Sequence, residues 1–133
     1  MSSDRIARLG QVPLFSELDQ PGLERLETIA NEFEVSQGHV LMERGQSGLG
    51  MFILESGRVR VDVPGADPVM LGPGDFVGEL SVLAETPRTA RVVAEEEVRG
   101  VAIRRQDLTA LLMEQPTIAL AMLRSLAFRY GAH

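Results

Sequence analysis

The middle of the chain is divided by turn-forming residues at short and regular intervals. Clusters of turn residues, each with a glycine or a proline, recur about every eight to twelve residues between Gly38 and Pro87, which is the spacing that turns give to short strands. Between the turns apolar and polar residues alternate, as at Val59 and Val61 beside Arg60, and this period of two is typical of half-buried strands. Many short strands with such turns predict an antiparallel β-roll, jelly-roll-like, of about eight strands.

Helical periodicity flanks this strand-rich region on both sides. Asp19 is a favourable N-cap for an N-terminal helix, and Pro116 suits the first turn of the last helix. The predicted boundaries are helices over about residues 4–33, the β-roll over about 34–103, and C-terminal helices over about 105–130. Because the 133 residues contain no visible linker, the sequence predicts one domain, residues 1–133, of mainly β structure with flanking helices.

The last predicted helix is apolar on two sides. One stripe consists of Ile118, Met122 and Leu126, and the other consists of Leu120, Leu123, Ala127 and Tyr130. One stripe can pack on the roll, whereas the second must cover a ligand, meet a partner chain, or remain exposed, which is unusual for so much apolar surface. Leu123, Ala127 and Tyr130 are therefore candidates for a lid, and a homodimer through this helix is the alternative.

Composition argues against several classes of function. The net charge of −6 and the lack of a basic stripe argue against a nucleic-acid partner. All 13 basic residues are arginines, typical of a GC-rich bacterial genome, and this removes lysine-based catalysis. The chain has no cysteine, and its histidines, His39 and His133, are too few for the metal sites that some rolls carry. We therefore expect no metal, no cofactor and no enzymatic activity.

The sequence carries no signal for export or for membrane insertion. The polar N-terminus, from Met1 to Arg5, is not followed by the apolar run of a signal peptide. No stretch approaches the length of a membrane-spanning helix. We expect a cytoplasmic protein without a membrane partner.

The segment from Gly78 to Ala90 carries the candidate binding residues. It reads G-E-L-S-V-L-A-E-T-P-R-T-A. A short helical turn after Gly78 would direct backbone amides toward an anion, and Arg88, returned by a turn at Pro87, would add a guanidinium that fits a phosphate. Glu79 cannot help to bind a phosphate, so we expect it to accept hydrogen bonds from a hydroxyl group such as that of a ribose. Together these features predict a nucleotide site.

This segment resembles the phosphate-binding cassette of cyclic-nucleotide-binding domains, as in catabolite-activator-type regulators and protein-kinase regulatory subunits. The family pattern is F-G-E-L-[AS]-L, a short variable stretch, and then P-R-[TAS]-A-x-V. This chain has F-V-G-E-L-S-V-L from Phe76 and P-R-T-A-R-V from Pro87. The one departure is Val77, which is inserted between the aromatic residue and the glycine.

Further matches to the same family lie upstream of the cassette. The chain has V-P-L-F from Val12, a glycine-punctuated stretch from Glu43 to Val61, and L-G-P-G-D-F from Leu71. The resemblance therefore covers nearly the whole chain, from about Val12 to Tyr130, and the combination is far more specific than a single G-E-L.

The resemblance implies a sensor for cAMP or cGMP, and the choice of base stays open. The implied ligand-binding residues are Gly78, Glu79, Leu80, Ser81, Arg88, Thr89 and Ala90. Candidates for the apolar pocket wall are Leu71, Phe76, Val77, Leu80 and Val92. By resemblance, ligand binding draws the cassette inward and the C-terminal helices follow.

Two questions about partners remain open from the sequence. Larger family members attach an effector where this sequence ends, so we expect either a free-standing sensor that acts on a protein partner or a regulatory domain excised from a fused effector. The competing interpretation is a protein-interaction module of the same fold whose nucleotide pocket is unused.

Overall fold

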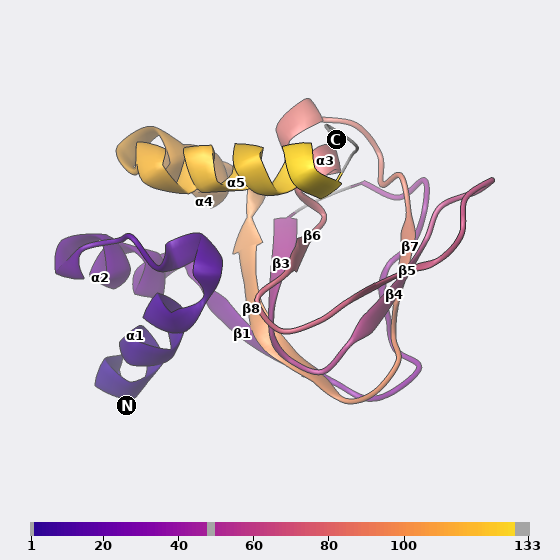
Figure 1. Ribbon diagram of the computed structural model, residues 1–133, viewed down its shortest axis with the longest axis horizontal. Helices are drawn as coiled ribbons and strands as arrows, with labels where there is room; N and C mark the ends of the chain where they lie inside the picture. The colour runs from indigo at the N-terminus through magenta and orange to yellow at the C-terminus, as the bar shows by residue number, and fades with distance from the viewer. Residues whose placement is uncertain (1, 48–49, 130–133) are drawn as a thin grey trace. The chain divides into compact units, whose positions relative to one another are not determined.

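The computed structural model describes residues 2–47 and 50–129 (Figure 1). The chain divides into two compact units, one formed by residues 30–106 and the other by residues 1–29 with 107–133. The single domain expected over residues 1–133 stays a prediction.

The unit of residues 30–106 is a β-roll made of eight antiparallel strands. The strands are β1 (Asn31–Val35), β2 (Val40–Met42), β3 (Gly50–Ser56), β4 (Val59–Asp62), β5 (Val69–Leu71), β6 (Phe76–Val77), β7 (Arg91–Ala94) and β8 (Val98–Arg104). They form two four-stranded sheets, with strand orders β1-β8-β3-β6 and β2-β7-β4-β5, and Figure 1 shows the two sheets facing each other. The predicted antiparallel roll is confirmed.

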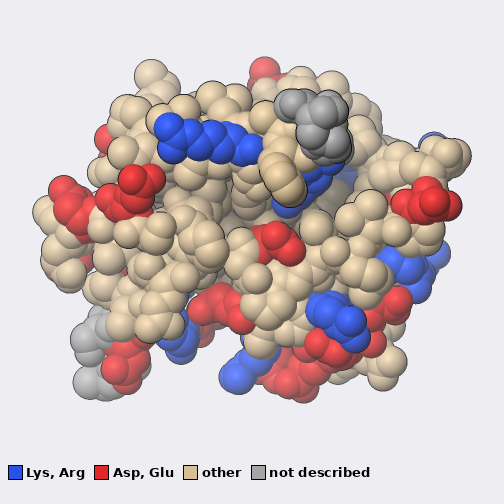
Figure 2. Space-filling view, viewed as in Figure 1, with Lys and Arg blue, Asp and Glu red and all other residues tan. Residues whose placement is uncertain are grey.

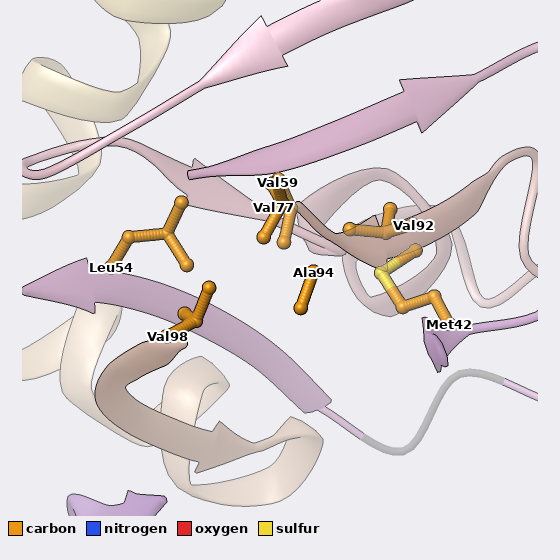
Figure 3. Packing of buried hydrophobic residues seen from close by; sticks show 7 residues of the cluster. All are labelled: Met42, Leu54, Val59, Val77, Val92, Ala94 and Val98. Carbon is orange, nitrogen blue, oxygen red and sulfur yellow. The ribbon is translucent and has the colours of Figure 1, made fainter. Parts of the chain in front are cut away.

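The core of the roll lies between these two sheets. Seven side chains from both sheets point toward one another there: Met42, Leu54, Val59, Val77, Val92, Ala94 and Val98 (Figure 3). Leu54 and Val59 are fully buried, on strands that belong to opposite sheets. Small β-branched side chains dominate, and they pack well on pleated surfaces that face each other at a short distance.

The first strand begins earlier than the sequence predicts. Local spacing extends the N-terminal helices to about residue 33, but β1 begins at Asn31, so Phe33 lies in a strand. Phe33 is placed opposite Gly100 of β8, and its ring meets that of Phe52 edge to face, with centroids 5.4 Å apart. A glycine opposite Phe33 leaves room for the ring, and this long-range pairing outweighs the local helical spacing.

Charged side chains of both signs are intermixed on the surface of the roll. Arg60 on β4 contacts Asp62 at 3.1 Å and Glu95 at 3.2 Å, and Arg99 on β8 lies 3.4 Å from Glu34 on β1. Figure 2 shows the same mixture of basic and acidic residues on the visible face. Ion pairs at a partly or fully exposed surface add little stability, but they leave no large field of one sign on this face.

The second unit is helical. Its elements are α1 (Ser2–Gln11), the short 3-10 helix η1 (Pro13–Phe15), α2 (Gln20–Ile29), α4 (Arg105–Glu114, which begins in the roll unit) and α5 (Pro116–Arg129). The side chain of Asp19 accepts a hydrogen bond from the backbone amide of Gly22 at 2.9 Å, which confirms the predicted N-cap. Arg25 of α2 donates two hydrogen bonds to the carboxylate of Glu114 at the end of α4.

The helical unit buries one of the two predicted stripes of the last helix. Ile118 and Met122 of α5 are buried, Leu126 is half-buried, and Leu120 and Leu123 of the second stripe are exposed. No helix in the described part of the chain combines the length and the hydropathy that a membrane-spanning segment needs.

Candidate functional site

A sharp change of direction at Gly78 begins the site. Gly78 joins β6 to the short helix α3 (Glu79–Ala84), and its φ angle of +92° is one that residues with a side chain rarely adopt. A Cβ atom at this position would lie 2.7 Å from Nη1 of Arg88 and 3.1 Å from the carbonyl oxygen of Gly50. Glycine is therefore required here both for its conformation and for the space it leaves.

The guanidinium of Arg88 lies against this glycine. Its Nη1 donates to the carbonyl oxygen of Gly78 at 3.1 Å, and its Nη2 donates to the carbonyl oxygen of Gly50 at 2.7 Å. Two donors of one planar group thus contact the first residue of β3 and the residue that precedes α3. As the sequence predicts, the chain turns back so that Arg88 lies next to the residue that precedes α3.

The backbone of Arg88 is hydrogen-bonded to a different segment, the loop that follows β2. Its amide donates to the carbonyl oxygen of Gln46 at 2.8 Å, and its carbonyl oxygen accepts from the amide of Gly45 at 2.9 Å. The neighbouring residue, Pro87, forms an isolated antiparallel bridge with Ser47. The loop after β2 therefore fixes the main chain on which the arginine side chain is mounted.

Glu79 and Arg88 are the charged residues that are buried among those the structure describes, with exposed fractions of 1% and 8%. Burial lowers the pKa of the Arg88 guanidinium from its ordinary value, and the nearby positive charge of Arg105 lowers it further. The negative charge of Glu79 acts in the opposite direction. Removing charges from water is costly unless they are paired and hydrogen-bonded. A buried carboxylate near a buried guanidinium is therefore a candidate for a binding site.

The other predicted ligand-binding residues lie on the same segment. Thr89 is exposed and Ala90 is buried, directly after Arg88. The backbones of Leu80 and Ser81 are in the first turn of α3, but the side chains of these two residues lie outside what the structure describes.

The candidates for the apolar wall do not all share one surface. Val77 and Val92 belong to the core cluster of the roll and Leu71 packs against it, whereas Phe76 is buried outside that cluster. Phe76 and Val77 are successive residues of β6, and successive side chains of a strand point to opposite faces. These two residues therefore face different sides of the strand, and the assignment of a ligand-facing wall stays a prediction.

Sequence reasoning missed three residues that surround the site. Gly50 and Gln46 supply carbonyl oxygens to Arg88, and the sulfur of Met42 lies near Gly78, where an added Cβ would meet it at 3.3 Å. The sequence pattern identifies the glycines of this stretch only as turn residues. The signal that could have found Gly50 is its position at the first residue of a strand, where a backbone carbonyl is accessible to another segment.

The proposed lid residues belong to the helical unit. Leu123 is 64% exposed and Ala127 is exposed, while Tyr130 lies outside the described residues. Phe128, which the sequence interpretation does not include, is 80% exposed. Within residues 2–47 and 50–129, the acidic and histidine side chains form no group of three or more that could hold a metal ion.

The sequence pattern of the cyclic nucleotide-binding domain family matches residues 32–115, which contain most of the roll together with Gly78, Glu79 and Arg88. The chain belongs to this family.

Relatives that carry this domain have several kinds of effector. The chain is 33% identical over 90% of its length to a cyclic nucleotide-gated potassium channel of Rhizobium etli. It is 28% identical over 91% of its length to a CRP-like cAMP-activated global transcriptional regulator of Mycobacterium tuberculosis. Among solved structures, a mutant of a cAMP-binding acyltransferase from Mycobacterium smegmatis superimposes with a TM-score of 0.80 at 30% identity, over 98% of this chain.

These three relatives are longer than this chain. The chain spans 34% of the length of the channel, 56% of the regulator and 42% of the acyltransferase. What it shares with them is a regulatory domain, and the channel, transcriptional and acyltransferase activities belong to those proteins.

Proposed function

We propose that this chain is a sensor domain for a cyclic nucleotide, cAMP or cGMP, which signals by moving its C-terminal helices. The observation that carries the proposal is the burial of Glu79 and Arg88 beside Gly78, in a chain whose sequence matches the cyclic nucleotide-binding domain family. Two relatives whose names specify cAMP favour that ligand over cGMP.

In this proposal Arg88 binds the cyclic phosphate. Its guanidinium is held by two neutral carbonyl oxygens, those of Gly78 and Gly50, and a planar fork of this kind matches the oxygens of a phosphate. Burial strengthens the attraction, because a charge that is removed from water is screened less. The backbone amides at the start of α3 and the hydroxyl of Thr89 would complete the contacts to the phosphate.

Glu79 has the complementary role toward the sugar. A carboxylate repels a phosphate but accepts hydrogen bonds from hydroxyl groups, and the ribose of a cyclic nucleotide presents its 2′-hydroxyl close to the phosphate. Glu79 begins α3 directly after Gly78. One turn of chain would therefore carry both the group that selects the sugar and the backbone that approaches the phosphate.

The output is proposed to pass through α4 and α5 to an effector. The relatives attach such domains to longer chains, so the effector is either fused or a separate protein partner. A sensor of this kind works by differential affinity of the ligand for two arrangements of the domain. The exposed residues Leu123 and Phe128 on α5 also suit the alternative, an interaction module that binds its partner without nucleotide.

Isothermal titration of the 133-residue chain with cAMP and with cGMP tests the proposal. We expect a Kd in the micromolar range or tighter for at least one of them, which corresponds to about −8 kcal/mol at about 1 µM. A chain that is folded by circular dichroism and releases no heat with either nucleotide at millimolar concentration would contradict the sensor and favour the interaction module.

A further inference from the structure

A second arginine lies at the end of the strand pair that holds Arg88. Gly50, whose carbonyl oxygen accepts from Arg88, is paired in register with Arg104, the last residue of β8. Arg105 follows directly and begins α4. The same pair of central strands that supports the guanidinium of Arg88 therefore also positions Arg105.

Arg105 is not an ordinary surface arginine. Its side chain is half-buried and its Nε atom is inaccessible to solvent. Burial is the main cause that lowers the pKa of Arg88, and the positive charge of Arg105 lowers it further, whereas Arg104, adjacent in sequence and exposed, is not among the causes. Charges that are partly removed from water interact over longer distances than exposed ones.

We infer that Arg105 is a second cation of the anion site, one that raises the affinity for the cyclic phosphate through its charge. This inference rests on the proposed function.

The charge balance of the site gives the reason. Glu79 offsets one of the two guanidinium groups, so these three residues carry one positive charge in excess. A cyclic phosphate carries a single negative charge, and its arrival would neutralise the excess and relieve the repulsion between Arg88 and Arg105. Without Arg105, Arg88 and Glu79 would already balance each other and the site would attract an anion less strongly.

Two variants separate the local charge from the overall charge. Arg105→Gln and Arg104→Gln each remove one positive charge from the chain, at adjacent positions. We expect Arg105→Gln to weaken cAMP binding roughly three- to tenfold at low salt, where tenfold corresponds to about 1.4 kcal/mol. Arg104→Gln should stay within about twofold of the parent, because exposed charges are screened. The difference between the two variants should shrink at high salt.

A third variant distinguishes charge from packing. Arg105→Lys keeps the charge on a different side chain, so it should retain most of the parent affinity. If Arg105→Lys and Arg105→Gln lose the same affinity, Arg105 has a structural role and the inference is wrong. It is also wrong if Arg105→Gln binds as Arg104→Gln does at low salt.

Nucleotide binding by the parent chain is measured first, because its result distinguishes a failure of this inference from a failure of the proposed function. A parent that binds neither nucleotide contradicts the function itself, and the inference with it. A parent that binds, together with an Arg105→Gln variant that binds equally well, contradicts only the role of Arg105. Circular dichroism of each variant establishes that a loss of binding is not a loss of the fold.

Discussion

The Nη2 atom of Arg88 donates to the carbonyl oxygen of Gly50 at 2.7 Å, across 38 positions of the sequence. Gly50 is the first residue of β3, a strand that pairs with both β8 and β6. The side chain proposed to bind the phosphate is thus supported by a central strand of the roll. Sites supported by rigid elements hold their geometry better than sites made only of loops.

Replacing Gly78 should damage both the fold and the site. In Gly78→Ala the new Cβ would adopt a disfavoured conformation, which costs about 1–2 kcal/mol, and it would press on Nη1 of Arg88 and on the carbonyl oxygen of Gly50. Gly65→Ala is the matched control, because Gly65 has a φ of +79° but open space around it. Chemical denaturation should show a larger loss of unfolding free energy for Gly78→Ala, and titration should show weaker nucleotide binding for that variant alone. Equal losses for the two variants would mean that the close approach to Arg88 is unimportant.

Removing the guanidinium should weaken nucleotide binding while the domain remains folded. Arg88→Ala loses charge-assisted hydrogen bonds, each of which contributes about 1.5–3 kcal/mol. Arg88→Lys should recover only part of this, since an ammonium lacks the two-pronged geometry. Isothermal titration measures both variants against the parent. The phosphate assignment fails if Arg88→Ala binds as tightly as the parent.

The role of Glu79 can be tested with the ligand as well as with the protein. Glu79→Ala should weaken binding of the parent nucleotide strongly and of its 2′-deoxy analogue much less, because the lost partner is the 2′-hydroxyl. Glu96→Ala, which removes an exposed carboxylate from the roll, is the control and should leave both affinities unchanged. Equal losses for the two ligands would indicate that Glu79 acts on the start of α3 or on folding instead.

Nucleotide should protect the last helix as well as the cassette. Leu120, Leu123 and Phe128 leave much apolar surface of α5 exposed, and a short helix takes most of its stability from packing. Hydrogen exchange should therefore slow across residues 117–129 when nucleotide is added, in addition to residues 78–90. Slowing that is confined to residues 78–90 would make α5 a fixed element, and some other part of the chain would have to transmit the signal.

The 133-residue chain should not bind duplex DNA specifically. Its net charge is −6, and the visible face in Figure 2 has no continuous basic stripe, so the field that holds a protein on phosphates is missing from that face. A gel-shift measurement with palindromic duplexes at physiological salt, with and without cAMP, checks this. A specific shifted band in either condition would overturn the prediction.

The sequence predicts best those features of the structure that depend on residues close together in the chain. A glycine before a short helix and an arginine after a proline turn depend on neighbouring residues, and spacing predicts both. Local spacing assigns Phe33 to a helix, but its strand depends on Gly100 and Phe52, which are distant in the sequence. The partners of Arg88 at Gly50 and Gln46 could not be predicted for the same reason, since only the pairing of strands and loops brings them close.

Val77 and Phe76 show the limit of a motif. The motif identifies both residues as part of the cassette, but only the register of β6 in its sheet decides which of them points into the core of the roll. A one-residue difference in register exchanges the two faces of a strand. Because this chain has Val77 as an extra residue between the aromatic residue and the glycine, the family pattern could not predict that register.

The backbone of Arg88 is bonded to Gly45 and Gln46, whereas its side chain is bonded to Gly50 and Gly78. The segment is therefore anchored even when the side chain changes. In the course of evolution, one substitution at this position would remove the proposed contact to the phosphate and leave a well-formed domain for selection to use in another way. Domains of this shape should accordingly include members that no longer respond to the nucleotide, and the identity of one side chain, more than the outline of the roll, would tell them apart.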